Sequence, residues 1–193
     1  MAHGRRGFTN LDIAQPNTYK RNGINKQLPL DELEYDLEHI KPNGKWTKEI
    51  QIGNNYEPYP PIEEKHEITK QVLELFTKYP DWKVHLETKN NLILRDIDII
   101  KQIPKFEAEI TITTLTHDNH FEPPPTPTTQ QRLDLIKELS DNDIFTRVMI
   151  MPILQGKKNY TDIPQIKKVC KQYGTKDFKA KQLNYIDIGD IKP

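Results

Sequence analysis

The stretch EAEITITTLTHDNHFEPPPTPTTQQRLDLI, residues 107–136, decides the fold class of this chain. Its first part, residues 107–114, is rich in β-branched side chains, which favour a β-strand. After a polar loop, Thr128 and Gln131 have the spacing of a capping box and predict the start of a helix. The apolar side of that helix consists of Leu133, Leu135, Ile136 and Leu139. A strand, a loop and a helix in this order form one βα unit.

The same order of elements recurs along the chain, which is typical of an α/β protein with a parallel sheet. Strands are predicted at residues 48–53, 83–88, 107–114 and 143–154, with a fifth at 183–188. Helices are predicted at residues 28–40, 62–79, 96–103, 128–139 and 162–173. Asp96 is expected to cap the third of these helices, and Gly174 to end the last.

The chain of 193 residues is long enough for one domain over residues 1–193. Within it, residues 1–27 are expected to be irregular, and residues 48–188 hold the βα repeats. Parallel strands joined by helices close into a barrel or form an open sheet, and ligands bind at the strands' carboxyl ends. The polar and proline residues gather there, because residues 53–63, 88–96, 113–127 and 152–159 each follow a strand. This edge of the sheet is therefore predicted to bind a ligand.

Charge and composition exclude several classes of partner. The 28 Lys and Arg residues balance the 28 Asp and Glu residues, so charge gives no support to a nucleic-acid partner. No apolar run comes close to the roughly 20 residues that cross a bilayer, and a signal-peptide core is lacking. We therefore expect a cytoplasmic protein without membrane contact. The single cysteine, Cys170, excludes an internal disulfide, and its apolar helical setting predicts a buried thiol.

The loop after the first predicted strand can serve a structural or a binding role. Gly53, Asn54 and Asn55 stand where the backbone must turn sharply. Glu57 follows on an arch that prolines stiffen, together with two tyrosines. From the residues alone, a rigid loop and a ligand-binding loop both remain possible.

The next loop places Lys89 just after a strand, beside Arg95 and Asp96. One interpretation is a surface lysine next to an Arg–Asp pair that caps the helix. The other is a ligand site, because an ammonium group beside a ligand carboxylate forms a charge-assisted hydrogen bond.

The third loop follows the strand 107–114 and is stiffened by prolines. The hydroxyl groups of Thr113 and Thr114 can bond a ribose or a carboxylate, and the Glu-Pro loop can present Glu122 at low entropic cost. His117 and His120 lie in this loop without a second pair of ligands, so we expect exposed histidines and no metal site.

Four segments of the chain resemble the core of the radical S-adenosylmethionine (SAM) proteins of the spore photoproduct lyase-like type. They are residues 50–76, 84–100, 108–136 and 146–156. The family patterns TKSxLIxRDxDLL and EPxAPxPxxRL are similar to residues 88–100 and 122–133, and GTxTDPYQPxE is similar to residues 53–63. The resemblance implies a partial (β/α) TIM-like barrel of the radical SAM type that lacks its first strand.

The resemblance also implies roles for particular residues, although it assigns no catalytic residue. Lys89 is expected near the SAM carboxylate or a substrate, Arg95 and Asp96 as a structural clamp, and Arg132 paired with Glu122 or in reach of SAM. The implied SAM-binding residues are Gly53, Asn54, Asn55, Glu57, Lys89, Thr113, Thr114, Glu122, Arg132 and Pro152.

The resemblance fails at the metal centre. In the family, three cysteines of a CxxxCxxC loop hold a four-iron four-sulfur cluster, whereas this chain has only Cys170, so the cluster ligands are absent. Residues 1–6, MAHGRR, resemble the sequence just after the last cluster cysteine, so the cluster loop is expected to precede this chain. We therefore predict that the chain alone is inactive.

The resemblance, together with the absence of the cluster cysteines, leaves two candidate functions. The first is a truncated form of a radical SAM enzyme, which would cleave SAM reductively and act on an unknown substrate. The second is an inactive SAM-binding or assembly module. Its partner would be a separate cysteine-bearing amino-terminal segment, or a second copy that pairs through the open sheet edge.

A third reading, a metal-dependent barrel enzyme, rests on four histidines. His66, His85, His117 and His120 occupy different loops and strands, and the sequence shows no carboxylates that converge on them. We therefore predict no metal ligands.

Overall fold

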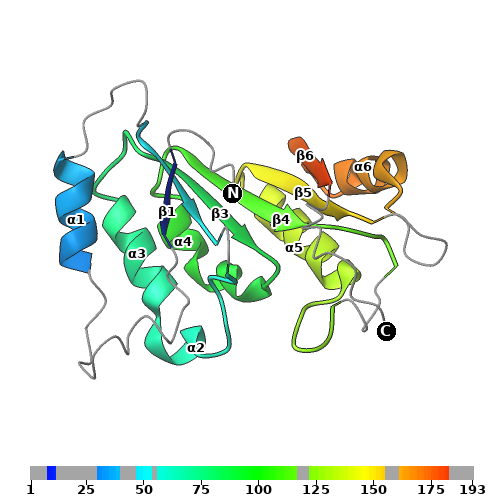
Figure 1. The fold of residues 1–193 in the computed structure, drawn as a ribbon, viewed down its shortest axis with the longest axis horizontal. Coiled ribbons are helices and arrows are strands. Elements are labelled where there is room, and N and C mark those ends of the chain that lie inside the picture. Colours follow the sequence, from blue (N-terminus) through cyan, green and yellow to red (C-terminus); the bar gives the residue numbers. More distant parts are fainter. Residues whose placement is uncertain are drawn as a thin grey trace, which may run out of the picture.

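The computed structural model describes residues 8–11, 30–39, 47–53, 56–116, 122–154 and 161–182. A six-stranded parallel sheet forms its centre, with the strands in sequence order from one edge to the other (Figure 1). The strands are β1 (Phe8–Leu11), β2 (Glu49–Ile52), β3 (Lys83–Thr88), β4 (Phe106–Thr111), β5 (Thr146–Ile153) and β6 (Asp177–Gln182).

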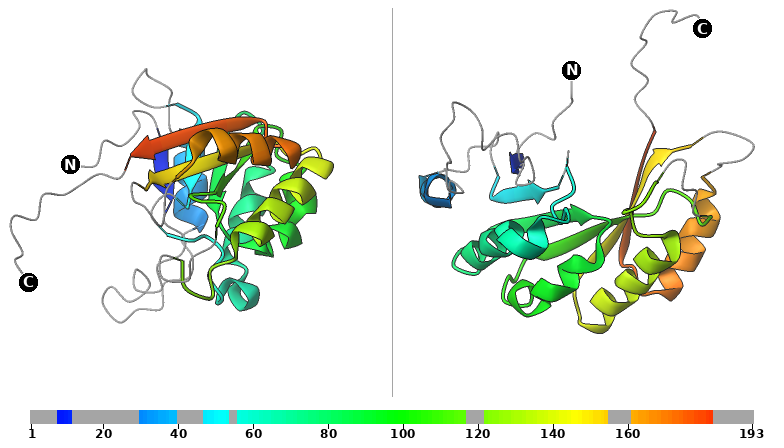
Figure 2. Two further views of the ribbon diagram at one scale, coloured as in Figure 1. Left: turned by 90° about the vertical axis from the view of Figure 1, so that its right-hand side faces the viewer. Right: turned by 90° about the horizontal axis from the view of Figure 1, so that it is seen from below.

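Helices follow the strands and lie on one side of the sheet. Figure 2 shows α3, α4, α5 and α6 on its outer side, with the opposite side curved inward. The helices are α1 (Leu30–His39), α2 (Glu63–His66), α3 (Ile68–Phe76), α4 (Ile97–Ile100), α5 (Thr129–Asp141) and α6 (Ile163–Gln172), and a 3₁₀ helix, η2 (Asn91–Asp96), precedes α4. The strand order makes the sheet an open, incomplete barrel, as the sequence predicted.

The two faces of the sheet differ in chemistry because side chains alternate along each strand. On the outer face, Val84 and Leu86 of β3 and Ile110 of β4 are buried in the hydrophobic core. On the inner face, the neighbouring positions carry His85, Glu107 and Glu109. TIM barrels commonly fill this interior with branched apolar side chains, so a polar interior indicates a lumen that is not simply a packed core.

Several local predictions are confirmed. The capping box of α5 is present, with the Thr128 hydroxyl accepting from the Gln131 backbone N–H and the Gln131 side chain accepting from the Thr128 N–H. The helix predicted at residues 162–173 is present as α6, and Asp162 caps it by accepting from the N–H of Gln165. Cys170 is fully buried in α6, and burial raises the pKa of its thiol to about 12.

Other predictions were wrong in detail. Strand β6 at residues 177–182 was not predicted, because Phe178 and Ala180 alternate with Lys179 and Lys181 in a segment whose lysines hide the pattern. The strand predicted at residues 183–188 lies outside the described residues. Short strand β1 lies within the segment 1–27 that was expected to be irregular. The helix expected at 62–79 is split into α2 and α3 by Glu67, which has a left-handed backbone with φ 49°.

In the ranges that the structure describes, no helix combines the length and the apolar character needed to span a membrane.

Candidate functional site

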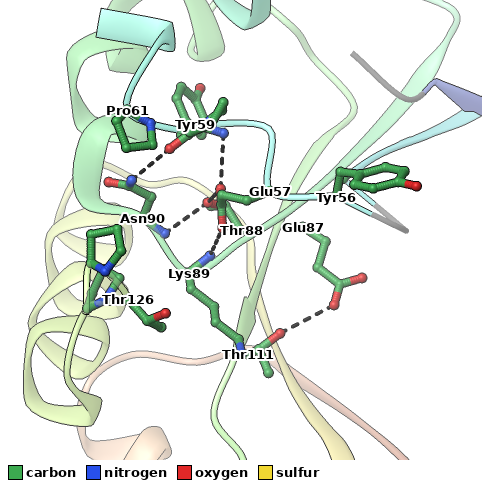
Figure 3. A pocket seen from close by; sticks show the side chains of 14 residues that line it. Tyr56, Glu57, Tyr59, Pro61, Glu87, Thr88, Lys89, Asn90, Thr111 and Thr126 are labelled. Atoms are coloured by element: carbon green, nitrogen blue, oxygen red, sulfur yellow. Dashed lines mark hydrogen bonds between the residues drawn. The ribbon is translucent and has the colours of Figure 1, made fainter. Parts of the chain in front are cut away.

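A cavity of about 460 Å³ lies where β2, β3 and β4 end, on the carboxyl side predicted to bind a ligand (Figure 3). Its size falls within the range of small-molecule sites. The lining comes from the last residues of β3 and β4 and from the three loops that follow these strands. The described lining residues are Gly53, Tyr56, Glu57, Tyr59, Pro60, Pro61, Glu87, Thr88, Lys89, Asn90, Thr111, Pro125, Thr126 and Pro127.

Gly53 allows the loop after β2 to pass close to β3. Its φ of +87° is a conformation that side chains disfavour, and a Cβ there would lie 2.2 Å from the carbonyl oxygen of Glu87. This position therefore requires glycine. The wall of the cavity here is the backbone of the loop after β2, which lies in close contact with the backbone of β3.

The carboxylate of Glu57 joins this loop to the end of β3. It accepts hydrogen bonds from the backbone N–H groups of Tyr59 and Lys89, each at 3.0 Å, and from the Thr88 hydroxyl. Glu57 therefore lines the cavity as the sequence placed it, and its oxygens hold the loop in place.

Lys89, Glu122 and Arg132 meet at one end of the site. Lys89 Nζ lies 2.7 Å from Glu122 Oε1, and Arg132 Nη1 lies 3.0 Å from the same oxygen. Arg132 is fully buried, pairs with the second Glu122 oxygen through Nη2, and donates to the Thr111 carbonyl at 2.9 Å. Burial alone would raise the pKa of Glu122, but the hydrogen bonds from Arg132 and Lys89 outweigh it and lower the pKa. The predicted pairing of Arg132 with Glu122 is confirmed.

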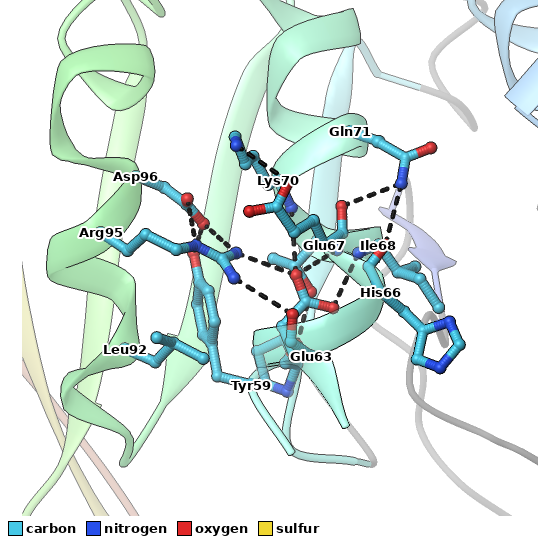
Figure 4. Close-up of polar contacts among 12 residues, drawn as sticks. Tyr59, Glu63, His66, Glu67, Ile68, Lys70, Gln71, Leu92, Arg95 and Asp96 are labelled. Atoms are coloured by element: carbon cyan, nitrogen blue, oxygen red, sulfur yellow. Dashed lines mark hydrogen bonds and ion pairs between the residues drawn. The ribbon is translucent and has the colours of Figure 1, made fainter. Parts of the chain in front are cut away.

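A second ion-pair group fixes the loop behind the cavity (Figure 4). Arg95 donates to Asp96 at 2.7 and 2.9 Å and to Glu63 Oε1 at 3.0 Å. Glu63 also accepts from the backbone N–H groups of Ile68 and Thr69, each at 2.9 Å. The predicted Arg95–Asp96 clamp is therefore confirmed.

Asp96 makes a long-range contact instead of capping its helix. The buried Tyr59 hydroxyl donates to Asp96 Oδ2 at 3.1 Å, and Asp96 makes no side-chain capping bond to α4, so the predicted cap is wrong. The cause is competition: Arg95 and Tyr59 already use both carboxylate oxygens. Burial raises the pKa of Tyr59, and the charge of Asp96 adds to the effect, so the hydroxyl stays protonated.

The remaining predicted residues are not among the described lining residues of the cavity or lie outside the described residues. Thr113 donates to the Met151 carbonyl at 3.2 Å, and Thr114 donates to the Thr116 carbonyl at 2.6 Å, so both hydroxyls bond to backbone. Pro152 lies near the end of β5 and is partly exposed. Asn54, Asn55, His117 and His120 are outside the described residues.

The inner face of the sheet holds a charged network below the cavity. His85 Nδ1 lies 3.1 Å from Glu107 Oε2 and 3.6 Å from Glu109 Oε1, so carboxylates do converge on one histidine, which the sequence analysis had missed. Arg147 Nη1 lies 2.8 Å from Glu107 and 2.9 Å from Glu109, and its Nε lies 2.7 Å from Asp177. Because the guanidinium group faces both carboxylates, the cluster forms an ion-pair network on the inner face of the sheet.

The sequence analysis also missed contributions from residues distant in sequence. Glu87 and Thr111 line the cavity from neighbouring strands, and the Thr111 hydroxyl donates to Glu87 at 3.3 Å. Asn90 donates to the Tyr59 carbonyl at 2.7 Å and joins two loops. Strand alternation could have placed Glu87 and Thr111 on the inner face, because apolar Leu86 and Ile110 precede them on the outer face.

The fold and the position of the cavity define a class: an open (β/α) barrel with its ligand site at the carboxyl ends of the strands. Solved structures of spore photoproduct lyase have this fold. The complex of that lyase with dinucleoside spore photoproduct matches with a TM-score of 0.58 and 12% sequence identity, over 78% of this chain and 44% of the lyase. SuiB of Streptococcus suis matches with a TM-score of 0.62 and 16% identity, over 89% of this chain and 37% of SuiB. The expected fold, a partial (β/α) barrel, is therefore confirmed, and the chain shares it with these solved structures.

A comparison of sequences finds a relative in an archaeon. An uncharacterized protein of Methanocaldococcus jannaschii is 31% identical over 123 residues, which are 60% of this chain and 42% of that protein. The chain thus spans less than half the length of this curated relative. No family model matches the sequence.

Proposed function

We propose that this chain is the SAM-binding part of a protein of the radical SAM type. The observation that supports the proposal is the cavity at the carboxyl ends of β2, β3 and β4, which Gly53, Glu57 and Lys89 line. One spore photoproduct lyase structure of similar fold is described with bound AdoMet, which is SAM (TM-score 0.55, 12% identity, 69% of this chain and 40% of the lyase).

Lys89 supplies the charge that a SAM carboxylate needs. Its ammonium group lies at the cavity and is held 2.7 Å from Glu122, with about a third of the side chain exposed. A ligand carboxylate can therefore share this ammonium group in a charge-assisted hydrogen bond. Arg132 keeps Glu122 in place when Lys89 turns to the ligand, because Arg132 contacts both Glu122 oxygens.

The residues of this chain do not fit an iron–sulfur cluster. Three thiolates are needed, and the chain has one cysteine, which is buried in α6 with its pKa raised to about 12. In the intact family the cluster supplies the electron that cleaves SAM. Our proposal for this chain is therefore SAM binding, and the reductive cleavage belongs to a form that carries cluster cysteines.

The lack of cluster ligands favours a second candidate, an inactive SAM-binding or assembly module. The open sheet of such a module would be completed by a cysteine-bearing segment or by a second copy of the chain. Either partner would pair with an edge strand of the sheet. The test is anaerobic reconstitution with iron and sulfide, followed by iron analysis and visible absorption. We expect a colourless protein from these 193 residues. A stable iron–sulfur chromophore would contradict this assignment.

Binding of SAM is measured by isothermal titration calorimetry on the chain as it stands. We expect Lys89→Met to weaken SAM binding about tenfold or more, because a charge-assisted hydrogen bond is lost. The matched control is Lys137→Met, an exposed lysine on α5 that pairs with Asp141. Urea unfolding of both variants checks that the fold is kept. Absence of SAM binding at millimolar concentration, or equal binding by the Lys89 variant and wild type, would refute the proposal.

A further inference from the structure

The helix at one end of the molecule presents acidic side chains to the outside. Helix α1 buries Leu33 and Leu37, and its sequence contains no lysine or arginine. Tyr35 is 61% exposed on the other side of the helix. Asp31 and Glu38, both exposed, lie one turn before and one turn after this tyrosine. Asp31, Tyr35 and Glu38 thus form an acidic face, in which an aromatic ring lies between two carboxylates.

The opposite end of the molecule is basic. Residues 163–182, which include α6 and β6, contain six lysines, and the acidic residue among them, Asp177, pairs with Arg147. Lys168 and Lys171 are exposed on the side of α6 that faces away from the core, and they form the basic face. Figure 2 shows α1 near the β1 end of the sheet and α6 near the β6 end. One molecule therefore carries two faces of opposite charge at its two ends.

The charges on these faces lack compensation within the described ranges of the chain. Lys168 and Lys171 are three residues apart, a spacing at which like charges destabilise a helix. Among the described residues, neither lysine has an ion-pair partner, and the same holds for Asp31. A partner that brings opposite charge to either face therefore adds attraction and relieves repulsion.

We propose that the acidic face of one copy of this chain docks on the basic face of another copy. Charge disfavours the symmetric arrangements, because two acidic faces, or two basic faces, repel each other. The faces lie at opposite ends of the molecule, so the contact is head to tail and can repeat. Tyr35 supplies contact area among the charges, as tyrosines commonly do in interfaces. The contact joins helices, requires no strand pairing and does not depend on SAM binding.

Such a contact is expected to be weak and sensitive to salt. Both helices have 10 residues and are about 15 Å long, so the buried area falls at the low end for protein interfaces. Exposed ion pairs contribute little each and are screened by salt. We expect a dissociation constant on the order of 100 µM at about 50 mM salt, weakened about tenfold at about 500 mM salt.

The test is sedimentation equilibrium of the whole chain at concentrations up to about 1 mM. One variant, Asp31→Lys with Glu38→Lys, reverses the acidic face, and another, Lys168→Glu with Lys171→Glu, reverses the basic face. Each alone should weaken self-association about tenfold or more. An equimolar mixture of the two variants should recover it, because opposite charges then meet again. Tyr35→Ser should weaken it about fivefold without a change of charge.

Matched controls separate the two faces from net charge and from exposed apolar area. Asp134→Lys with Glu138→Lys, at exposed positions of α5, makes the same change of net charge as the acidic-face variant. Ile62→Ser removes another exposed apolar side chain. Both controls should keep the self-association of wild type. Circular dichroism checks that every variant is folded.

Each outcome supports or overturns the docking of the two faces. Self-association that falls with salt, with either reversal and with Tyr35→Ser, and that returns in the mixture, supports it. A wild type that stays monomeric at about 1 mM and low salt refutes it. Association that survives either reversal, or a mixture that stays monomeric, also refutes it. A monomeric wild type that binds heparin through Lys168 and Lys171 would assign the basic face to a polyanion instead.

Discussion

Arg147→Met should strongly destabilise the protein, because Arg147 neutralises two carboxylates on the inner face of the sheet. Its guanidinium lies 2.8 Å from Glu107 and 2.9 Å from Glu109, and the Glu109 side chain is fully buried. Removing one partner of a buried ion pair typically costs about 3–5 kcal/mol, since the other charge remains without compensation. We expect a loss of about 3 kcal/mol or more in the free energy of unfolding, measured by urea denaturation at pH 7.

The pH dependence gives a second measure of the same interaction. Burial alone would raise the pKa of Glu109, but contacts from His85, Arg147 and Gln51 outweigh it and lower the pKa to about 2. A folded pKa below the ordinary value of 4.5 stabilises the protein above pH 4.5, and this stabilisation is lost as the pH falls toward 2. At 1.36 kcal/mol per pH unit, it amounts to about 3 kcal/mol. Without Arg147 this dependence should weaken, so variant and wild type should differ less at pH 3 than at pH 7.

Two further variants make this prediction decisive. Adding Glu109→Gln to the Arg147 variant should restore part of the lost stability, because one uncompensated charge is removed. Lys137→Met, which breaks an exposed pair with Asp141, should change stability by less than about 1 kcal/mol. Either of two results would refute the claim that Arg147 compensates the charge of buried carboxylates. In the first, Arg147→Met lowers the free energy of unfolding by less than about 1 kcal/mol. In the second, the double variant recovers no stability.

Three other substitutions or probes test the loops and the core. Gly53→Ala should lower the free energy of unfolding in urea by about 1–3 kcal/mol and weaken SAM binding, because its Cβ would press on the Glu87 carbonyl at a positive φ. An unchanged midpoint of urea unfolding would contradict the close contact between Gly53 and Glu87. Tyr59→Phe should cost about 1–2 kcal/mol through loss of the buried bond to Asp96, with stability as the readout; a neutral effect would argue against that bond. Cys170 should react with Ellman's reagent at pH 8 only after unfolding, given its burial and raised pKa; fast reaction in the native protein would refute this.

Elements that depend on neighbours in sequence were predicted well. Strand β3 has the predicted bounds, and α5 begins at the predicted capping box, because both signals lie within a few residues. The loops after β2 and β3 also supplied cavity residues as expected, since parallel strands bring their carboxyl ends to one edge. Strand β6 was not predicted because its lysines mask an otherwise alternating pattern.

What the sequence could not show are contacts that depend on strand register. His85 lies opposite Glu107 on β4, and Glu109 lies opposite Arg147 on β5, so four residues distant in sequence become one network only when the sheet is formed. The same holds for Asp96, whose partner Tyr59 is 37 residues away and outcompetes the local capping role. A carboxylate can take several partners, and the fold decides which ones are near. The role of an acidic residue in this protein therefore follows from the neighbouring strand more than from its own motif, which is why Glu87 was recognised as a cavity-lining residue only in the structure.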